Sequence, residues 1–505
     1  MFALSTKAKL ALIAASVFML CLSNPGMPLP WLSWFALAPL FVACQSMNRG
    51  RTAISFFLFG GLWWSWSIHW LIPSIMAFTG SSLFVAITLW LSLSFIQALP
   101  YALIGYFWHA AQCFHSPRLN QLAAAALFAV SVDLLTPLIP GTVAHSQYLY
   151  PLVIQLADIA GPALMAFFVV FINLQWPALI KPNWQGQQRQ QAITNLALSI
   201  LIIVGYGYFR LHQFDDSKAD QSLTVGYIQP NLQRSSDTHR LAELSGALYQ
   251  QHPTIELLVW PEFPAAFSWQ ENIADRAMVT RLMTTVKTPL LLNSGYVYAP
   301  RNDDGKRGYY NSNQLIGRDG KLLANYHKQI LVPFFEYLPF EQQLKPLRRW
   351  FPQALDYRPG PENSSVILND NFSLATPICY EILFDYFFQK NDFDSIINQS
   401  NDGWFAHDSR GSVSHLALGL FRSVEYRRPW LRVSNSGISV ATKASGKIIP
   451  SSQLATGVQD SAVVTLHSHH ATSPYSGIGR YLTAFMALVL IAALTIARWR
   501  QQADQ

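Results

Sequence analysis

The chain has 505 residues, of which 51% are hydrophobic and 12% charged, with 16 tryptophans and a formal net charge of +7. This composition excludes a disordered chain and an ordinary cytosolic protein. Residues 1–211 contain two acidic residues and eight Lys or Arg, whereas residues 212–479 contain 25 acids and 24 bases. The positive excess lies on the apolar part, so it does not indicate a nucleic-acid partner. The pattern predicts a membrane protein with one large soluble domain.

Eight apolar segments are candidates for transmembrane helices, because about 20 apolar residues are needed to cross a bilayer core. The segments cover residues 8–23, 31–47, 53–77, 82–109, 120–139, 158–180, 193–211 and 480–497. Lys7 and Lys9 precede the first segment, as they would in a signal peptide. A small-residue cleavage site does not follow it, so a retained helix is the favoured interpretation.

The positive charges of the short loops indicate how the helices are oriented. With eight spans, nine Lys and Arg lie on one side, and only Arg210 and Arg480 flank the other. Since loops rich in Lys and Arg stay in the cytoplasm, residues 212–479 are expected in the periplasm of a bacterium. The predicted organisation in the bacterial inner membrane is a seven-helix region over 1–211, a periplasmic domain over 212–479, and a last helix with a cytoplasmic tail over 480–505.

Two groups of side chains stand out within the apolar segments. An aromatic cluster comprises Trp63, Trp64, Trp66, His69 and Trp70. Interfacial anchoring and helix packing are the favoured roles for these rings. Asp133 lies in the fifth segment, where an ionisable group either has a function or caps a neighbouring helix. Both interpretations of Asp133 stay open.

The segment between 212 and 479 alternates short β-rich runs with amphipathic stretches. Strands are predicted at 223–229, 255–260, 289–298, 313–317, 321–326, 365–368, 373–378, 395–398 and 431–442, and helices at 237–251, 271–286 and 411–427. This alternation predicts one α/β domain built as a sheet sandwich.

Three polar residues each follow an apolar strand of this domain: Glu262, Lys328 and Cys379. Side chains at the carboxyl ends of strands converge at one edge of an α/β sheet. Taken singly, each is a common rim or core residue. Together they supply a base, a cation and a nucleophile, which is the minimum set for acyl transfer through a covalent intermediate.

The sequences around these residues point to a known family. The motifs are Trp260-Pro261-Glu262, Lys328 followed by Leu331-Val332-Pro333-Phe334, Ile378-Cys379-Tyr380-Glu381, and Ser400-Asn401-Asp402-Gly403-Trp404-Phe405. They resemble the Glu-Lys-Cys motifs of the nitrilase superfamily and, more closely, those of its membrane branch, the apolipoprotein N-acyltransferases. The resemblance covers the whole chain. It implies a membrane α-helical bundle of about eight helices with an inserted nitrilase-like α/β domain.

The resemblance implies a reaction without a cofactor or a metal. An acyl chain would pass from a membrane phospholipid, through a thioester on Cys379, to the N-terminal amine of S-diacylglyceryl-cysteine in an apolipoprotein. Glu262 would be the acid-base group, and Lys328 with the Tyr380 backbone N–H would stabilise the oxyanion. Glu336 would hydrogen-bond Lys328, assist at the amine, or form a plain salt bridge. Glu381 would orient the substrate or cap the following helix.

Four positions depart from the usual pattern of that family. Pro230 stands where glycine is common, Phe263 where Ser or Thr often follows the glutamate, Ile330 in place of histidine, and Phe335 in place of glycine. The three motif residues, Glu262, Lys328 and Cys379, are retained, whereas residues expected around the substrate differ. The lipid and acyl-chain preference therefore stays open.

Two further stretches have competing interpretations. Residues 334–337 and 350–351 are aromatic-rich and bracket Arg348 and Arg349, which fits either an arm on the outer leaflet or a solvated surface loop. His415, Arg422 and Glu425 share one face of a predicted helix and are expected to hold it to the sheet. The sequence contains neither Cys/His spacing typical of a metal site nor a phosphate-binding glycine loop.

Two other functions compete with acyl transfer to an amine. A membrane-tethered nitrilase-like amidohydrolase would use the same three residues with water as the acceptor. The second alternative is a lipid transporter with an outer regulatory domain. A transporter would be expected to have more intramembrane polar residues than Asp133.

Overall fold

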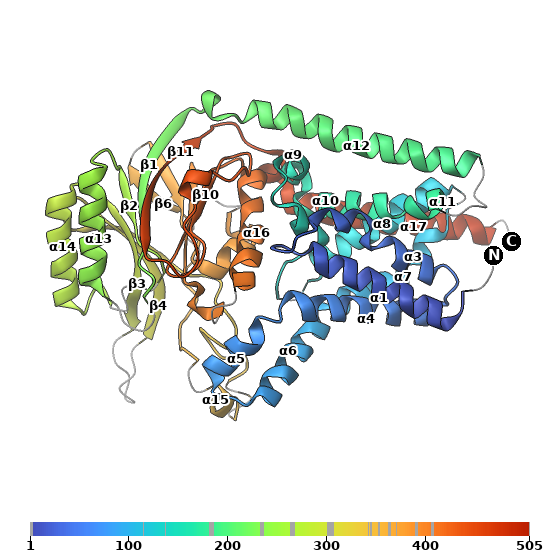
Figure 1. Ribbon diagram of the computed structural model, residues 1–505, viewed down its shortest axis with the longest axis horizontal. Helices are drawn as coiled ribbons and strands as arrows, with labels where there is room; N and C mark the ends of the chain where they lie inside the picture. The colour runs from blue at the N-terminus through green and yellow to red at the C-terminus, as the bar shows by residue number, and fades with distance from the viewer. Residues whose placement is uncertain are drawn as a thin grey trace.

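The computed structural model describes residues 4–114, 116–136, 138–180, 186–232, 237–262, 268–299, 308–341, 343, 346–351, 354–361, 365–369, 371–388, 392–405 and 409–503. Two parts lie side by side along the long axis of the molecule (Figure 1). One part contains the helices up to residue 213 together with the last helix, and the other is a domain with two β-sheets.

The helical part begins its helices where the sequence supplies caps. The side chains of Ser5, Asn48 and Ser82 accept hydrogen bonds from N–H groups in the first turns of three helices, which satisfies donors that have no partner within a helix. The helices are α1 (Thr6–Ser23), α2 (Ser33–Ala36), α3 (Ala38–Cys44), α4 (Arg49–Ser67), α5 (Leu71–Thr79), α6 (Leu83–Gln97), α7 (Leu99–Phe107), α8 (Pro117–Leu134), α9 (Pro151–Ile154), α10 (Ala157–Asn173), α11 (Trp176–Ile180), α12 (Gln187–Gln213) and α17 (Pro474–Ala503).

Several of these helices have the length and composition of membrane spans. Four stretches of the described chain qualify: Thr6–Ser23, Leu83–Gln112, Ala157–Ile180 and Gln187–Gln213. Shorter apolar helices cover Pro30–Cys44 and Tyr481–Ala497. The helical, membrane-type character predicted from the sequence is therefore present, whereas the count of eight spans is not confirmed by these criteria.

The predicted span at residues 53–77 is divided in the structure. α4 ends at Ser67, and α5 begins at Leu71. Pro73 lies in the first turn of α5, where its missing N–H is tolerated, whereas in a continuous helix it would leave the carbonyl of His69 without a donor. The chain therefore turns, and α5 and α6 lie together at the lower edge of the molecule in Figure 1.

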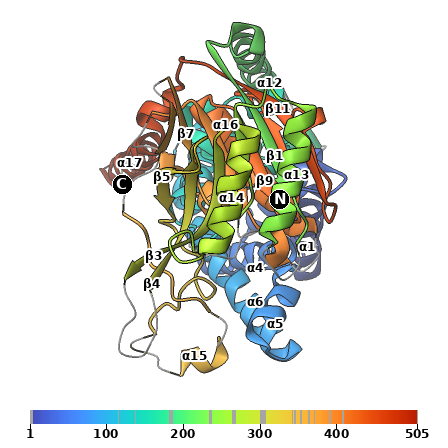
Figure 2. The same ribbon diagram turned by 90° about the vertical axis from the view of Figure 1, so that its left-hand side faces the viewer.

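The sheet domain contains a six-stranded sheet in the order β11-β1-β2-β3-β4-β5 and a five-stranded sheet in the order β10-β9-β8-β7-β6 (Figure 2). The strands are β1 (Gln221–Gln229), β2 (Leu257–Val259), β3 (Leu290–Ala299), β4 (Gly308–Ile316), β5 (Leu322–His327), β6 (Ser365–Asn369), β7 (Phe372–Ala375), β8 (Ser395–Ser400), β9 (Trp430–Ser434), β10 (Val440–Thr442) and β11 (Asp460–Ser468). Strands β1, β2 and β3 are mutually parallel, as are β7, β8 and β9.

Alternating side chains give the larger sheet two buried faces. Ile228 and Leu258 pack with the helices α13 (Thr238–Gln251) and α14 (Ile273–Val286) on the outer face. Val225 and Leu257 belong to the core shared with the second sheet, as in other sheet sandwiches. The predicted α/β sandwich is therefore confirmed.

Helix α16 (Ser409–Tyr426) lies between the second sheet and the helical part (Figure 1). Leu420 and Val424 of α16 share one hydrophobic core with Met165 and Ile172 of α10. The core therefore continues from the sheets into the helices, and the two parts are packed together rather than joined by a linker.

Two strand predictions differ from the structure. The predicted strand at 431–442 is a hairpin of β9 and β10, because residues 435–439 turn between them. Strand β11 was not predicted, and it pairs antiparallel with β1 from Gln221↔Ser468 to Gln229↔Asp460. It is an edge strand in which only Val464, Leu466 and Ser468 are buried, so the alternation that identifies a strand is confined to its last residues.

Candidate active site

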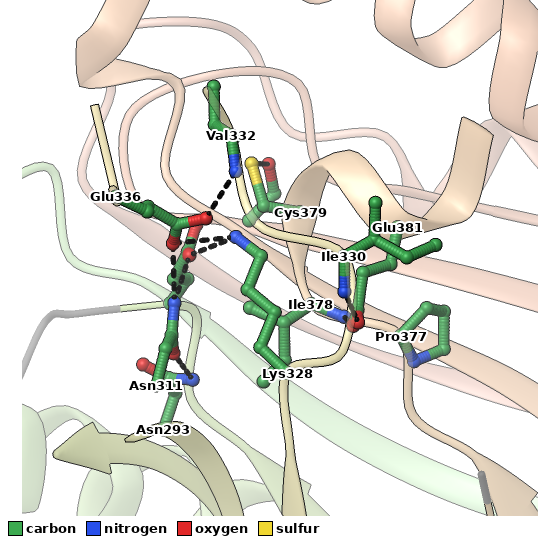
Figure 3. Close-up of polar contacts among 12 residues, drawn as sticks. Asn293, Asn311, Lys328, Ile330, Val332, Glu336, Pro377, Ile378, Cys379 and Glu381 are labelled. Carbon is green, nitrogen blue, oxygen red and sulfur yellow. Dashed lines mark hydrogen bonds and ion pairs between the residues drawn. The ribbon is translucent and has the colours of Figure 1, made fainter. Parts of the chain in front are cut away.

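The three strand-end residues converge at one place, and Figure 3 shows two of them, Lys328 and Cys379. Glu262 follows β2, Lys328 follows β5, and Cys379 begins a 3₁₀ turn, Cys379–Leu383, after β7. The Nζ atom of Lys328 lies 3.4 Å from Oε1 of Glu262. All three side chains line the same cavity. The predicted convergence is thus present in the structure.

Glu336 and an unpredicted residue, Asn311, complete a buried polar cluster (Figure 3). Lys328 Nζ donates to Oε1 of Glu336 at 2.9 Å. The amide of Asn311 on β4 donates to Oε1 of Glu262 at 2.9 Å and to Oε1 of Glu336 at 3.1 Å. Each of the two carboxylates therefore receives both an ammonium and an amide donor.

Cys379 has a backbone φ of +50°, a left-handed conformation that is strained for a non-glycine residue. One carboxylate holds this turn. Oε2 of Glu381 accepts the Ile378 N–H at 2.7 Å, while its Oε1 accepts the Ile330 N–H at 3.0 Å and the Tyr326 hydroxyl at 2.7 Å. Glu381 therefore caps the 3₁₀ turn and ties it to the loop after Lys328, and it is itself fully buried.

The sulfur of Cys379 also lies beside the end of β8. The Oγ atom of Ser400 is 3.5 Å from Sγ, and it is 3.0 Å from Oδ1 of Asp402. Asp402 pairs with the guanidinium of Arg432. On the other side of the turn, Nε2 of His415 lies 3.2 Å from the Cys379 carbonyl oxygen.

Burial and neighbouring charges determine the protonation of these groups. Burial and, to a smaller extent, the charge of Glu262 raise the pKa of the Cys379 thiol to about 12, although Lys328 opposes the shift. Burial also raises the pKa of Glu262, an effect that the ammonium of Lys328 counteracts. For Lys328, burial would lower the pKa, but Glu336 and Glu262 outweigh it, so the pKa lies above its ordinary value. The resting thiol is therefore neutral, and nucleophilic attack requires a base.

A cavity of about 480 Å³ opens from these residues into the helical part. Apolar side chains of α5 and α6, such as Leu71, Ile75 and Leu93, line it together with Phe334 and Phe351 of the domain. The wall is therefore mostly apolar, although polar side chains of the helical part such as Ser74, Ser92 and Thr142 also line it.

The aromatic cluster of α4 and α5 has a role that the sequence analysis did not favour. Trp63, Trp64 and Trp70 line the cavity. The ring of Trp70 also packs against that of Phe405 at a centroid distance of 4.8 Å. Trp66, in contrast, is 40% exposed, as expected for an anchoring residue. Trp63 and Trp64 also belong to the hydrophobic core of the helical part, so the predicted packing role is present and lining the cavity is an additional one.

The remaining predicted residues occupy distinct places. The Tyr380 hydroxyl donates to the Leu138 carbonyl at 2.6 Å, which joins the nucleophile turn to the helical part. Arg348 pairs with Glu341 at 2.7 Å and with Asp356, so its charge is compensated within its own loop. Asp133 is exposed on α8 and is not part of the cavity wall.

The predicted role of His415, Arg422 and Glu425 in holding α16 to the sheet is found for one of the three residues. His415 contacts Arg432 of β9, so it does hold α16 to the sheet. Arg422 instead pairs with Glu425 on the same helix at 2.6 Å. The expectation for this face is therefore confirmed for His415 and replaced by an intrahelical ion pair for the other two.

Three of the four departures from the family pattern fall on described residues. Pro230 is buried just after β1, and Phe335 lines the cavity. The backbone N–H of Ile330 donates to Glu381. Phe263 lies outside the described residues.

Sequence reasoning missed Asn311 and Asn293, and it gave Ser400 only as part of a family motif, without a role. A run of four polar residues, Asn311 to Gln314, inside a buried strand was the available signal, because buried polar groups require partners. Ser400 is the last residue of a strand, so the strand-end criterion used for Cys379 would also have selected it. Within the described residues, no group of three or more His, Cys, Asp or Glu side chains could hold a metal ion.

Comparison with known proteins assigns families to both parts of the chain. Residues 16–175 match the model of the apolipoprotein N-acyltransferase N-terminal domain, and residues 224–468 match that of carbon-nitrogen hydrolase. The apolipoprotein N-acyltransferase of Caulobacter vibrioides is 29% identical over 68% of this chain and 67% of its own length. That of Rhizobium etli is 28% identical over 87% of both chains. The crystal structure of a carbon-nitrogen hydrolase from Helicobacter pylori G27 is 15% identical, with a TM-score of 0.38, over 48% of this chain and 89% of its own.

Proposed function

This chain belongs to the apolipoprotein N-acyltransferase family, and we propose that it transfers an acyl chain from a phospholipid, through a thioester on Cys379, to the N-terminal amine of S-diacylglyceryl-cysteine in apolipoproteins. The observation that carries this proposal is the cavity. It begins at Cys379, Glu262 and Lys328 and continues between apolar helices, as a site for a lipid acyl chain requires.

In the first half of the reaction, the thiol of Cys379 attacks the ester carbonyl of the phospholipid. Glu262 accepts the thiol proton and then gives it to the departing oxygen of the lysophospholipid. The developing oxyanion is stabilised by the Lys328 ammonium and the Tyr380 backbone N–H. One such donor changes the rate by roughly 10²–10³.

In the second half, the neutral amine of the lipoprotein attacks the thioester. Glu262 accepts the proton of the attacking nitrogen and returns a proton to the Cys379 sulfur, so an amide and a free thiol are formed. The acyl group remains activated throughout, since a thioester reacts readily with an amine. Glu336 keeps Lys328 in place during both steps through their 2.9 Å contact.

The membrane arrangement is part of the proposal. The helical part crosses the bacterial inner membrane about eight times, with residues 1–211 before the domain and 480–505 after it. Residues 212–479 face the periplasm, where both the phospholipid headgroup and the lipoprotein amine are accessible. The asymmetry of Lys and Arg between the two sets of loops supports this orientation.

Intact-mass measurement of the purified protein in phospholipid micelles tests the proposal. One acyl mass is expected on Cys379, and a diacylated lipopeptide should then remove it as an amide. Cys379→Ser should form no thioester and no triacylated lipopeptide, whereas Cys113→Ser, which changes a cysteine outside the cavity wall, should behave as the unmodified protein.

The two alternative functions give different outcomes of the same experiment. Release of free fatty acid or ammonia without transfer to the lipopeptide would support an amidohydrolase. Movement of lipid between leaflets without any acyl-enzyme would support a transporter. Normal triacylation by Cys379→Ser would show that the thioester mechanism is wrong.

A further inference from the structure

Asn311 is fully buried on β4 and contacts both carboxylates of the site; Figure 3 shows it beside Glu336. An amide group has two protons to donate. Both are used on carboxylates, at 2.9 Å to Oε1 of Glu262 and at 3.1 Å to Oε1 of Glu336. These are the same two oxygens that the ammonium of Lys328 contacts at 3.4 and 2.9 Å.

A second asparagine determines which way the Asn311 amide points. Asn293 on the adjacent strand β3 donates its Nδ2 to Oδ1 of Asn311 at 2.9 Å, and also to Oδ1 of Asn313 at 2.9 Å. If the Asn311 amide were flipped, its oxygen would face the two carboxylates and its NH₂ would face the NH₂ of Asn293. Neither contact would be a hydrogen bond, so only the observed orientation satisfies these buried groups.

The occupied Oε1 atom of Glu262 contrasts with its other oxygen. Oε2 is buried and has no hydrogen-bond partner among the described N–H and O–H groups. Cys379 and Glu262 line the same cavity, and a hydrogen bond with the Cys379 thiol lowers the pKa of this carboxyl group. Two donors on one oxygen therefore leave the other oxygen available for the proton of the nucleophile.

We propose that Asn311, held in place by Asn293, is a positioning residue for the proton transfer between Cys379 and Glu262. It keeps Oε1 of Glu262 occupied, leaves Oε2 for the thiol, and stabilises the ionised carboxylate. The inference rests on the proposed function, in which Glu262 is the base.

The test is the pH dependence of acyl-enzyme formation in single turnovers, followed by intact mass. Asn311→Asp preserves the shape and the acceptor for Asn293 but replaces the donor with a carboxyl group. Ionised Glu262 then loses a donor and gains a like charge, so the acid limb of the profile should move to higher pH by about one unit or more. Asn311→Ala should move it in the same direction, and Asn293→Ala by a smaller amount.

A matched control lies two residues along the same strand. Asn313 is equally buried, but its amide donates to the Thr376 carbonyl at 3.0 Å and not to a carboxylate. Asn313→Ala should lower the thermal stability and leave the acid limb where it is. If both Asn311 variants fail to fold, the acid limb of the Asn293→Ala profile tests the proposal: a move to higher pH supports it, and an unmoved limb overturns it.

The outcomes separate this inference from the function on which it rests. If the unmodified protein forms no acyl-enzyme at any pH, the proposed function fails and the inference fails with it. If it forms one, and the folded variants are slower with an unmoved acid limb, Asn311 has only a structural role and the positioning inference alone is overturned.

Discussion

The hydroxyl of Ser400 lies between the sulfur of Cys379, at 3.5 Å, and the carboxylate of Asp402, at 3.0 Å. A serine hydroxyl has one proton, so it can donate to only one of them at a time. Burial opposes ionisation of Asp402, but Arg432, His415 and the Ser412 hydroxyl together outweigh it and keep the pKa of this carboxyl below its ordinary value. The resting hydroxyl therefore donates to the nearer carboxylate, and it can turn to the sulfur when a thiolate forms.

Ser400→Ala removes this donor, and the hydrogen bond from Ser400 lowers the pKa of Cys379 in the intact protein. The pKa of the thiol is therefore expected to rise, and alkylation of Cys379 by iodoacetamide at a fixed pH should slow by up to about tenfold. Ser400→Thr keeps a hydroxyl and is the control. Equal alkylation rates for Ser400→Ala and the unmodified protein would contradict a role for this contact.

Lys328→Met removes the cation from the buried cluster. Acyl-enzyme formation is expected to fall by roughly 10²–10³, since an oxyanion donor is lost. Glu262 and Glu336 lose their ion-pair partner, so stability should fall by about 3–5 kcal/mol. Both effects are measured on one preparation, by intact mass and by thermal unfolding.

Adding Glu336→Gln to Lys328→Met separates these two effects. In Lys328→Met, two buried carboxylates lack a counter-charge, whereas in the double variant only Glu262 does. The double variant should therefore recover part of the lost unfolding temperature. It should not recover acyl-enzyme formation. Recovery of the rate together with the stability would mean that Lys328 acts only through folding.

Glu381→Gln tests the carboxylate that holds the nucleophile turn. The Ile378 N–H and the Ile330 N–H are accepted by different oxygens of Glu381, so a glutamine would turn its NH₂ group toward one of these donors. A buried donor left without a partner costs about 1–3 kcal/mol, which should appear as a lower unfolding temperature. The strained φ of Cys379 should also be less well maintained, so acyl-enzyme formation should slow. An unchanged rate and unfolding temperature would rule out this holding role.

Tyr380→Phe tests the connection between the domain and the helical part. The variant loses the 2.6 Å hydrogen bond to the Leu138 carbonyl but keeps the backbone N–H proposed for the oxyanion. We expect a stability loss of about 1 kcal/mol and a slower first half-reaction with an unmoved pH profile. Protease sensitivity of the loop around Leu138 should increase in the variant. A shifted pH profile would instead point to a direct role of the phenol in proton transfer.

Much of the site could be predicted because its residues are marked locally. Glu262 and Lys328 follow apolar strands of the larger sheet, and strands that run in the same direction end at a common edge. Cys379 also follows an apolar strand, but β7 belongs to the smaller sheet, so the packing of the two sheets brings the thiol to the other two residues. Asn311 and Asn293 lie inside strands, where nothing in the neighbouring sequence says which buried amide faces a carboxylate. Their role depends on the pairing of β3 with β4, a long-range relationship that local patterns do not encode.

The aromatic cluster is a second case in which the local sequence does not determine the role of a side chain. An indole at a membrane interface and an indole that lines a cavity have the same local sequence context. Trp63, Trp64 and Trp70 were assigned to packing and anchoring, and only the approach of the domain to α4 and α5 makes them walls of the cavity.

The sequence by itself determined the two-part organisation, the apolar helices, the sandwich class and the three strand-end residues, because hydropathy, charge and strand ends are local properties of a chain. The tertiary structure decided that β11 forms an edge of the larger sheet, that Asn311 donates to two carboxylates, and that helices line the cavity at Cys379. These features arise where segments far apart in the chain meet. They follow from the packing of side chains across elements rather than from any one segment.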